Sequence, residues 1–363
     1  MSEMKVDVVC ASSGLDNRRR RGYEQSTLIT HRILLKEGIR SLLVKRVEAV
    51  SDESSKTLLR LPFNKLLHWL GDQVGETFMF EYILFGFQLA FLRDIRSAKF
   101  VYTQEPWVAR TLTRLKQIGF LKSTVEIHFV CGVTMNEEFI PRFGDVQWVV
   151  NPEVHRKAVE KFKDSEIQFL PNPFEMSKRF IPAKSTSISP LPKTRDKWIL
   201  VVGAINRNIK RTHLITEAWS ERYSDDFGLC LLGEIQDETI VHQIRHHEAF
   251  FHQYTSPEDV SKFIYYADFI CLASLNEGFP NILLECLLND KIPFLTQNPA
   301  NQILLSRLPE NLIDFSRTDW IGSLKNHINE AEIAQELRAE FSEGFNKLIR
   351  YFKSRLRPEN QID

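Results

Sequence analysis

Short apolar runs, rich in β-branched and aromatic residues, alternate with longer amphipathic runs along nearly the whole chain. The short runs predict strands at residues 5–11, 98–102, 125–131, 146–151, 167–170, 198–203, 228–232, 269–273 and 293–296. The longer runs predict helices at residues 23–37, 108–118, 153–163, 212–222, 258–267 and 281–289. Alternation of this kind favours parallel sheets with helices on both faces. The expected fold class is therefore α/β.

The alternation is interrupted once, at residues 181–197, IPAKSTSISPLPKTRDK. This segment is rich in Ser, Pro and Lys and shows neither a helical nor a strand period. A chain of 363 residues is long for one core and suits two domains. We therefore expect a first domain at residues 1–180, a linker at 181–197 and a second domain at 198–329. Residues 330–363 are expected to hold a long polar helix that could pack back on the first domain.

Composition indicates a folded protein, with 43% hydrophobic and 26% charged residues. The five cysteines, Cys10, Cys131, Cys230, Cys271 and Cys286, are scattered and form no C-x-x-C pair. This pattern predicts a reducing compartment, without a disulfide framework or a zinc knuckle. The first residues, MSEMKVDVVCASSG, lack the charged and then apolar layout of a signal peptide, so we expect a cytoplasmic protein.

Charge is balanced overall but not along the chain. Residues 1–180 hold 27 Lys and Arg against 22 Asp and Glu, and residues 181–363 hold 20 against 25. So small an imbalance does not predict a nucleic-acid partner. A basic first half could favour an anionic partner, although ordinary surface variation explains it equally well.

One apolar stretch, TFMFEYILFGFQLAFLRD, lies at residues 77–94. It is too short to span a bilayer and contains Glu81 and Gln88. We favour a helix buried on all sides in the first domain. The alternative is that Phe78, Phe80, Phe85 and Phe87 form a surface for a membrane or an acyl chain, which would make the protein a peripheral membrane protein.

The chemistry is concentrated in SLNEGFPNILLECLLND, residues 274–290. A buried strand precedes it, LNEG forms the loop at the strand's carboxyl end, and Pro280 suits the first turn of a helix. The amides of Asn281, Ile282 and Leu283 are then expected to be unpaired, which creates an anion site suited to phosphate.

Glu277 lies just before this predicted helix, and Glu285 lies about a turn into it. Arg207 and Lys210 follow the strand predicted at residues 198–203 and could neutralise a diphosphate. Carboxylates on either side of a phosphate site suit a ligand with hydroxyls at both ends, and a nucleotide sugar has that layout. Two glutamates eight positions apart would, by themselves, be ordinary surface charges.

With these residues identified, NEGFPNILLECL resembles the E-G-F-P-N-x-x-x-E signature of glycosyltransferase family 4. Further segments are similar to that family: VVGAINRNIKRTHLITEAW and SPEDVSKFIYYADFICLASLNEG in the second half, and RRGYEQST, CGVT and FLPNPFE in the first. The resemblance implies a GT-B fold, in which two Rossmann-like, doubly wound domains face each other across a cleft. It also implies a retaining enzyme that uses a nucleotide sugar as donor.

The resemblance assigns roles to the second domain's residues. Glu277 would hold the donor sugar's hydroxyls, and Glu285 would bind the ribose. Gly203 is the strand glycine, and Arg207 and Lys210 would stabilise the departing nucleoside diphosphate. The donor would also meet the backbone of the signature residues Gly278, Phe279, Pro280, Asn281, Ile282 and Leu283. The sequence contains no D-x-D motif, so we expect neither a metal nor another cofactor.

In the first domain the resemblance places Arg21, Gly22, Cys131 and Gly132 on the acceptor side. Relatives carry a histidine where this chain has Cys131. They also carry an arginine where it has Ala204 and a glycine where it has Pro173. The arginine run at residues 18–21 is either a solvated loop or a site for an anionic acceptor.

The resulting prediction is a hexosyltransferase of polysaccharide biosynthesis that transfers a sugar to a glycan, a lipid-linked or a small-molecule acceptor. It would act in the cytoplasm or at the inner face of a membrane. The alternative is a catalytically degenerate protein of the same fold that binds a nucleotide sugar without transferring it.

Overall fold

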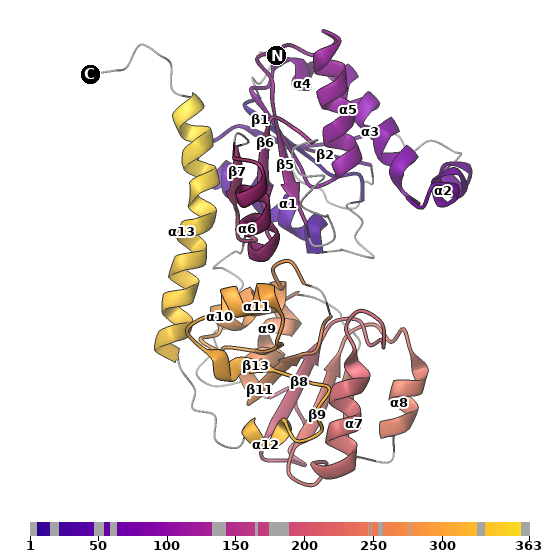
Figure 1. Cartoon of the computed structure of the whole chain (residues 1–363), viewed down its shortest axis with the longest axis vertical. Helices are drawn as coiled ribbons and strands as arrows, with labels where there is room; N and C mark the ends of the chain where they lie inside the picture. The colour runs from indigo at the N-terminus through magenta and orange to yellow at the C-terminus, as the bar shows by residue number, and fades with distance from the viewer. Residues whose placement is uncertain are drawn as a thin grey trace. The chain divides into compact units, whose positions relative to one another are not determined.

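The computed structural model describes residues 6–14, 22–46, 54–58, 64–132, 143–163, 166–173, 189–245, 247, 249–252, 257–275, 277–324 and 331–356. The chain splits into two compact units (Figure 1). Unit 1 comprises Met1–Pro173 and Ser342–Asp363, and unit 2 comprises Phe174–Phe341. Of the predicted linker, residues 181–188 lie outside the described residues, and residues 189–197 form neither helix nor strand.

Unit 1 contains a parallel sheet of seven strands in the order β3-β2-β1-β4-β5-β6-β7. The strands are β1 Val8–Ala11, β2 Ser41–Lys45, β3 Ser55–Thr57, β4 Phe100–Thr103, β5 Glu126–Cys131, β6 Val146–Val149 and β7 Ile167–Phe169. The strand order changes direction between β1 and β4, which pair with Val9 opposite Val101. This doubly wound order opens a crevice at the carboxyl ends of β1 and β4, where ligands of such sheets bind.

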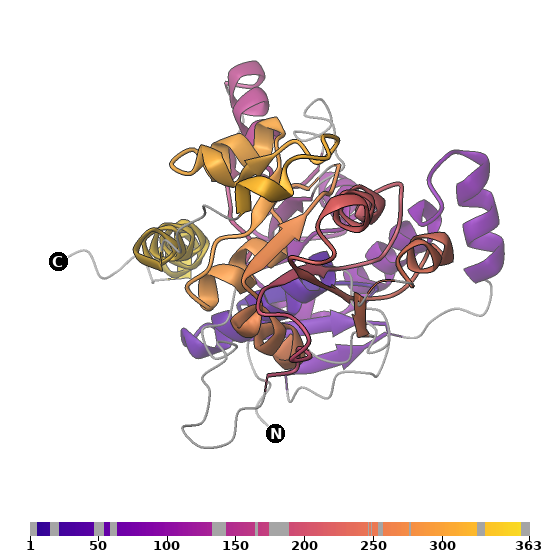
Figure 2. The ribbon, with the colours of Figure 1, turned by 90° about the horizontal axis from the view of Figure 1, so that it is seen from below.

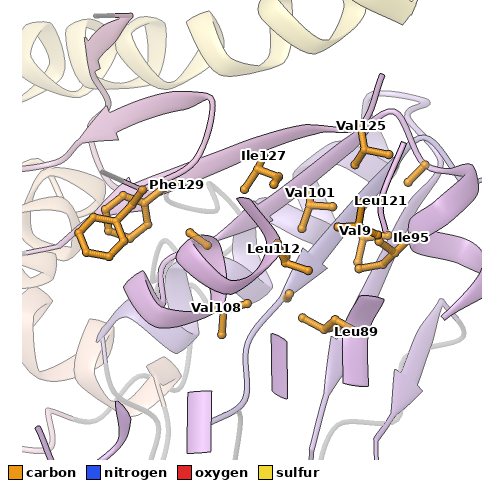
Figure 3. Packing of buried hydrophobic residues seen from close by; sticks show 14 of the residues in the cluster. Val9, Leu89, Ile95, Val101, Val108, Leu112, Leu121, Val125, Ile127 and Phe129 are labelled. Atoms are coloured by element: carbon orange, nitrogen blue, oxygen red, sulfur yellow. The ribbon is translucent and has the colours of Figure 1, made fainter. Parts of the chain in front are cut away.

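The helices of unit 1 are α1 Gly22–Lys36, α2 Asn64–Gln73, α3 Met79–Phe91, α4 Arg93–Ser97, α5 Pro106–Gln117 and α6 Pro152–Lys161. Their apolar faces complete a core in which Leu89 of α3 and Leu112 of α5 pack with Val9 and Val101 of the sheet (Figure 3). The prediction that the helix around α3 is buried on all sides was wrong. Phe85 and Leu89 are buried, but Phe87 is 42% exposed and Phe91 is 67% exposed.

Unit 2 repeats the same winding in a parallel sheet of six strands, in the order β10-β9-β8-β11-β12-β13. Helices lie on both sides of this sheet (Figure 2). The strands are β8 Trp198–Val202, β9 Gly228–Leu232, β10 Ala249–His252, β11 Phe269–Leu272, β12 Phe294–Thr296 and β13 Leu312–Ile313. The helices are α7 Thr212–Arg222, α8 Glu238–Ile244, α9 Pro257–Tyr266, α10 Asn281–Leu288, α11 Pro299–Leu304 and α12 Ile321–Leu324, with a 3-10 turn η3 at Pro309–Asn311.

The last helix, α13, spans Ala331–Leu356, and its residues belong to both units. Within unit 2, Arg338 pairs with Asp290 at 2.8 Å and donates to the carbonyl of Leu287. Within unit 1, the ring of Phe352 packs on Phe100 with centroids 4.7 Å apart. The C-terminal helix expected from the sequence is therefore present.

Every strand expected from the sequence is found, and the predicted α/β class with doubly wound sheets is confirmed. Strands β2, β3, β10 and β13 were not expected. Within the described ranges, no helix combines the length and the apolar composition needed to cross a membrane.

Candidate functional site

The strand order of unit 2 changes direction between β8 and β11, which pair in parallel with Leu200 opposite Ile270. Two loops leave the sheet there. Residues 203–211 follow β8, and the described residues 273–275 and 277–280 follow β11. Because ligands of doubly wound sheets bind where the strand order changes direction, these loops form the first candidate site.

The loop after β8 begins with a close approach of two glycines. The amide of Gly203 donates to the carbonyl of Leu232 at 2.9 Å, and Gly203 has a φ of 123°. A Cβ at Gly233, which follows β9, would lie 1.9 Å from the Gly203 carbonyl oxygen. Both positions therefore need glycine, and the ends of β8 and β9 lie against each other.

Asn206 fixes the rest of this loop, since its Oδ1 accepts from the amides of Ile209, at 3.1 Å, and Lys210, at 2.9 Å. The loop is also joined to the loop after β11. The amide of Leu275 donates to the carbonyl of Ile209 at 2.9 Å, and Arg211 Nε donates to the carbonyl of Ala273 at 2.8 Å. Lys210 thus has a defined backbone position beside the second loop.

Lys210 and Glu277 meet across the two loops, where Lys210 Nζ donates to Glu277 Oε1 in an ion pair. Their side chains are 29% and 15% exposed, so a ligand can reach both. A Cβ at Gly203 would lie 3.5 Å from Lys210 Cε, which shows that the lysine's aliphatic stem passes over that glycine. Two residues predicted to bind different parts of one donor, Lys210 its diphosphate and Glu277 its sugar hydroxyls, therefore lie side by side.

Glycine and proline lead from Glu277 into α10. Pro280 caps the helix with a φ of −68° and a ψ of 121°, and Phe279 is buried with its ring centroid 5.0 Å from that of Phe341. The expectation of an unpaired amide at Leu283 was wrong. Leu283 donates to the carbonyl of Pro280 at 3.0 Å because the chain tightens into a turn at the helix start.

Other predicted donor residues lie outside the ion pair. Arg207 contacts Glu217 and Asp237, each at 3.2 Å, and donates to Gln243 at 3.2 Å. These partners come from α7, α8 and the N-cap of α8. Glu285 lies on α10 with a partly buried side chain. The structure therefore brings Lys210 and Glu277 together, and holds Arg207 against a different group of side chains.

A cavity of about 330 Å³ opens at the carboxyl ends of β9 and β10. Its walls come from Ile205, Leu231, Gly233, Glu234, Ile235, Phe251 and His252. Sequence reasoning missed this pocket because β10 was not predicted. The available signal was Gly233, which follows β9 as Gly203 follows β8.

The residues predicted for the acceptor side belong to unit 1. Arg21 lies outside the described residues, Gly22 begins α1, and Gly132 directly follows β5. Cys131 is fully buried in the core, and its burial raises the pKa of the thiol to about 12. Its sulfur therefore lies in the interior of unit 1, and its place on the acceptor side stays a prediction.

Sequence reasoning also missed Glu105, which lies between β4 and α5 where the strand order of unit 1 changes direction. Glu105 Oε1 accepts from the Ser13 amide at 2.7 Å, the Ser13 hydroxyl at 3.0 Å and the Ser12 hydroxyl at 3.3 Å. Oε2 is buried and has no hydrogen-bond partner among the described residues. Burial raises the pKa of this carboxyl to about 7, against the opposing hydrogen bonds from Ser13.

No group of three or more His, Cys, Asp or Glu side chains that could hold a metal ion occurs in the part of the chain that is described. All five cysteines are buried and unpaired with each other.

Residues 184–347 match the protein-family model described as glycosyl transferases group 1. This region covers almost half of the chain, including all strands of unit 2 and much of α13. No curated protein sequence matches the chain significantly.

Solved structures resemble nearly the whole chain. HepE of Anabaena, in complex with UDP-glucose, has a TM-score of 0.65 at 12% identity, over 96% of this chain and 100% of that one. A glycosyltransferase of Rickettsia africae has a TM-score of 0.65 at 13% identity, over 98% and 100%. The UDP-forming α,α-trehalose-phosphate synthase of Burkholderia vietnamiensis has a TM-score of 0.65 at 8% identity, over 97% and 100%.

These identities are low, so the likeness establishes the fold, which is the two-domain α/β arrangement called GT-B. Together, the family match and this fold support a glycosyltransferase of the GT-B type.

Proposed function

We propose that this protein is a family 4 glycosyltransferase that moves a hexosyl group from a nucleoside diphosphate donor to an acceptor hydroxyl. The observation that carries the proposal is the Lys210–Glu277 ion pair between the loops that follow β8 and β11. A cation beside a carboxylate matches the two chemical needs of a sugar nucleotide, which are charge neutralisation at the diphosphate and hydrogen bonding at the sugar. The match of residues 184–347 to glycosyl transferases group 1 supports this choice.

In the proposed complex the donor lies along the carboxyl edge of the unit 2 sheet. Lys210 contacts the diphosphate, and Glu277 accepts hydrogen bonds from the sugar hydroxyls. The backbone from Gly278 to Leu283 and the side chain of Glu285 contribute further donor contacts. The apolar cavity at β9 and β10 has walls suited to a planar base, with Glu234 and His252 as polar partners. The UDP-glucose named for the Anabaena structure makes UDP-sugars the first donors to test.

The reaction breaks the bond between the anomeric carbon and the diphosphate oxygen and forms a bond from that carbon to the acceptor oxygen. We propose that the configuration is retained, with attack on the face from which the diphosphate departs and transfer of the acceptor proton to the departing phosphate. Negative charge grows on the diphosphate as the bond breaks, and Lys210 stabilises it without a metal. Arg207 would join Lys210 only after leaving Glu217 and Asp237.

The acceptor is proposed to bind unit 1 near Gly22 and Gly132. A glycan, a lipid-linked sugar or a small molecule would each fit this role, and the arginines at residues 18–21 favour an anionic one.

The test is incubation with UDP-, GDP-, ADP- and CDP-sugars and a cell-lysate acceptor pool, followed by mass spectrometry of the products. One donor should give a product with an added hexose, unaffected by EDTA. Glu277→Ala should abolish transfer and leave nucleoside diphosphate binding intact, whereas the exposed Glu221→Ala should transfer normally. Donor binding without any product would favour the nucleotide-sugar-binding alternative, and normal turnover by Glu277→Ala would remove that residue from the mechanism.

A further inference from the structure

Helix α3 buries the charged Glu81 together with Phe85 and Leu89, and it presents Phe87 and Phe91 to solvent. Glu81 accepts from Arg46 at 2.9 Å and lies 2.7 Å from His68, and Arg46 also donates to Gln88 at 3.3 Å. Glu81 and Arg46 are buried. These contacts fix the rotation of α3 about its axis, and Phe87 and Phe91 consequently point outward.

Helix α5 lies beside α3 (Figure 1), and further apolar side chains are exposed in the turn that follows α5. Phe91 and Phe120 meet edge to face with centroids 5.1 Å apart, and Phe120 is 37% exposed. Ile118, two residues earlier, is 77% exposed. We call Phe87, Phe91, Ile118 and Phe120 the α3–α5 patch. A contiguous group of large exposed apolar side chains usually marks a surface that binds something.

Basic side chains surround this patch. The guanidinium of Arg96 lies 5.0 Å from the centre of the Phe120 ring, and Arg114 precedes Ile118 by one helical turn. Lys122 follows Phe120 by two residues and is exposed, as are Arg96 and Arg114. The nearby acidic residue Asp94 is paired with Lys56 at 2.5 Å. The surroundings of the α3–α5 patch are therefore positively charged.

A second apolar stripe, on and just after α2, differs in its charge. Leu66, Trp69 and Val74 are more than half exposed, but the exposed acids Asp72 and Glu76 lie beside them in the chain. Apolar character alone would give both surfaces the same partner. The difference in charge separates them, because an anionic partner suits only the α3–α5 patch.

We propose that the α3–α5 patch docks on the surface of an anionic lipid bilayer. Phenylalanine and isoleucine side chains enter the boundary between headgroups and acyl chains, while Arg96, Arg114 and Lys122 contact the anionic headgroups. Helices α3 and α5 both run from the carboxyl end of the sheet toward its amino end. Helix α5 starts just after the carboxyl end of β4, and α3 ends just before the amino end of β4, with only the short α4 between them. The patch therefore lies at the amino edge of the sheet, and a docked membrane leaves the carboxyl edge of unit 1 open.

The test uses the full chain and two kinds of vesicle, one of phosphatidylcholine alone and one of equal parts phosphatidylcholine and phosphatidylglycerol. The protein should co-sediment with the mixed vesicles, only weakly with the neutral ones, and less as salt is raised. Phe91→Ser should weaken binding roughly tenfold or more, because one buried aromatic ring is lost from the interface. Trp69→Ser on α2, which changes an aromatic side chain that is also more than half exposed, should bind as the unaltered protein does.

Equal effects of Phe91→Ser and Trp69→Ser, or equal binding to both kinds of vesicle, would overturn the proposal. The competing hypothesis is that the α3–α5 patch binds a second copy of this chain, and sedimentation velocity tests it. A dimer that dissociates in Phe91→Ser would show such pairing and overturn the proposal. Circular dichroism of each variant confirms folding, and both changed side chains are exposed. The inference does not rest on glycosyl transfer, because vesicle binding requires neither donor nor acceptor.

Discussion

At the scale of single residues, Glu105 and Glu277 occupy equivalent places in the two sheets. Glu105 follows β4, which pairs with β1, and Glu277 follows β11, which pairs with β8. The strand order of each sheet changes direction between these two strands. Their surroundings differ, because Glu277 pairs with Lys210 whereas Glu105 is buried among serine donors. One position therefore holds a carboxylate ready for a ligand, and the other holds a carboxyl that burial keeps largely protonated up to about neutral pH.

The raised pKa of Glu105 gives a pH-dependent stability whose sign is fixed. Because the pKa rises from 4.5 to about 7 on folding, the folded state holds the extra proton between these values and loses stability as the pH increases. The full difference between the folded and unfolded pKa corresponds to roughly 3 kcal/mol of unfolding free energy. Glu105→Gln should abolish this loss, which chemical denaturation at about pH 5 and about pH 8 would measure. If the difference in unfolding free energy between Glu105→Gln and the unaltered protein were the same at both pH values, the result would contradict the burial of this carboxyl.

Sequence reasoning located Lys210 and Glu277 but not their surroundings. Both residues follow clear apolar strands. Because the carboxyl ends of parallel strands lie at the same edge of a sheet, the sequence predicts that these two residues lie close together. Arg207 has the same local signal, yet its partners Glu217 and Asp237 come from elements whose packing is invisible in a one-dimensional pattern. Glu105 gave no signal, since its burial depends on Ser12 and Ser13, about ninety residues away.

At the scale of elements, α13 is tied to unit 1 by an aromatic and polar cluster. The Trp148 indole donates to His128 Nδ1 at 2.9 Å, which leaves the proton of the neutral ring on Nε2, 2.9 Å from Glu126 Oε1. The hydroxyl of Tyr351 on α13 donates to the same carboxylate. Burial opposes the charge of Glu126, but the contacts with His128 and Tyr351 outweigh it and lower its pKa to about 2. The cluster thus supplies polar partners for a helix that also carries the buried Phe352.

Phe352→Ala should therefore destabilise unit 1. The ring is fully buried and contacts Phe100 and His128, so its removal should cost about 3–5 kcal/mol. Denaturation followed by tryptophan fluorescence measures the loss, with the exposed Lys347→Ala on the same helix as the control, expected within about 0.5 kcal/mol. If the two variants were equally stable, α13 would not be anchored through this ring.

Two of the strands that were not expected have weak patterns. Strands β3 and β13 are three and two residues long, and β3 is the polar tripeptide SKT, so neither has enough residues to show a period. Helix α3 failed in another way, because its composition is mostly apolar and predicts burial. The rotation that exposes Phe87 and Phe91 follows from Arg46, which lies just after β2 and pairs with Glu81.

At the scale of the whole molecule, two sheets with the same strand order present different chemistry. Unit 2 carries the ion pair and the cavity along one edge, and unit 1 carries Glu105 at its corresponding edge and the α3–α5 patch at the opposite one. The doubly wound class followed from alternation of strands and helices because that alternation is a property of the entire chain. The donor, the acceptor and the surface chemistry depend on side chains that converge only after folding.

If Lys210 and Glu277 hold a sugar nucleotide, thermal unfolding with a panel of UDP-, GDP-, ADP- and CDP-sugars should detect it. One member at millimolar concentration should raise the melting temperature by a few degrees. Lys210→Ala should lose that rise, whereas Lys197→Ala, which removes an exposed lysine of the same unit, should keep it. No rise with any donor, or an equal rise in both variants, would show that Lys210 does not hold a sugar nucleotide.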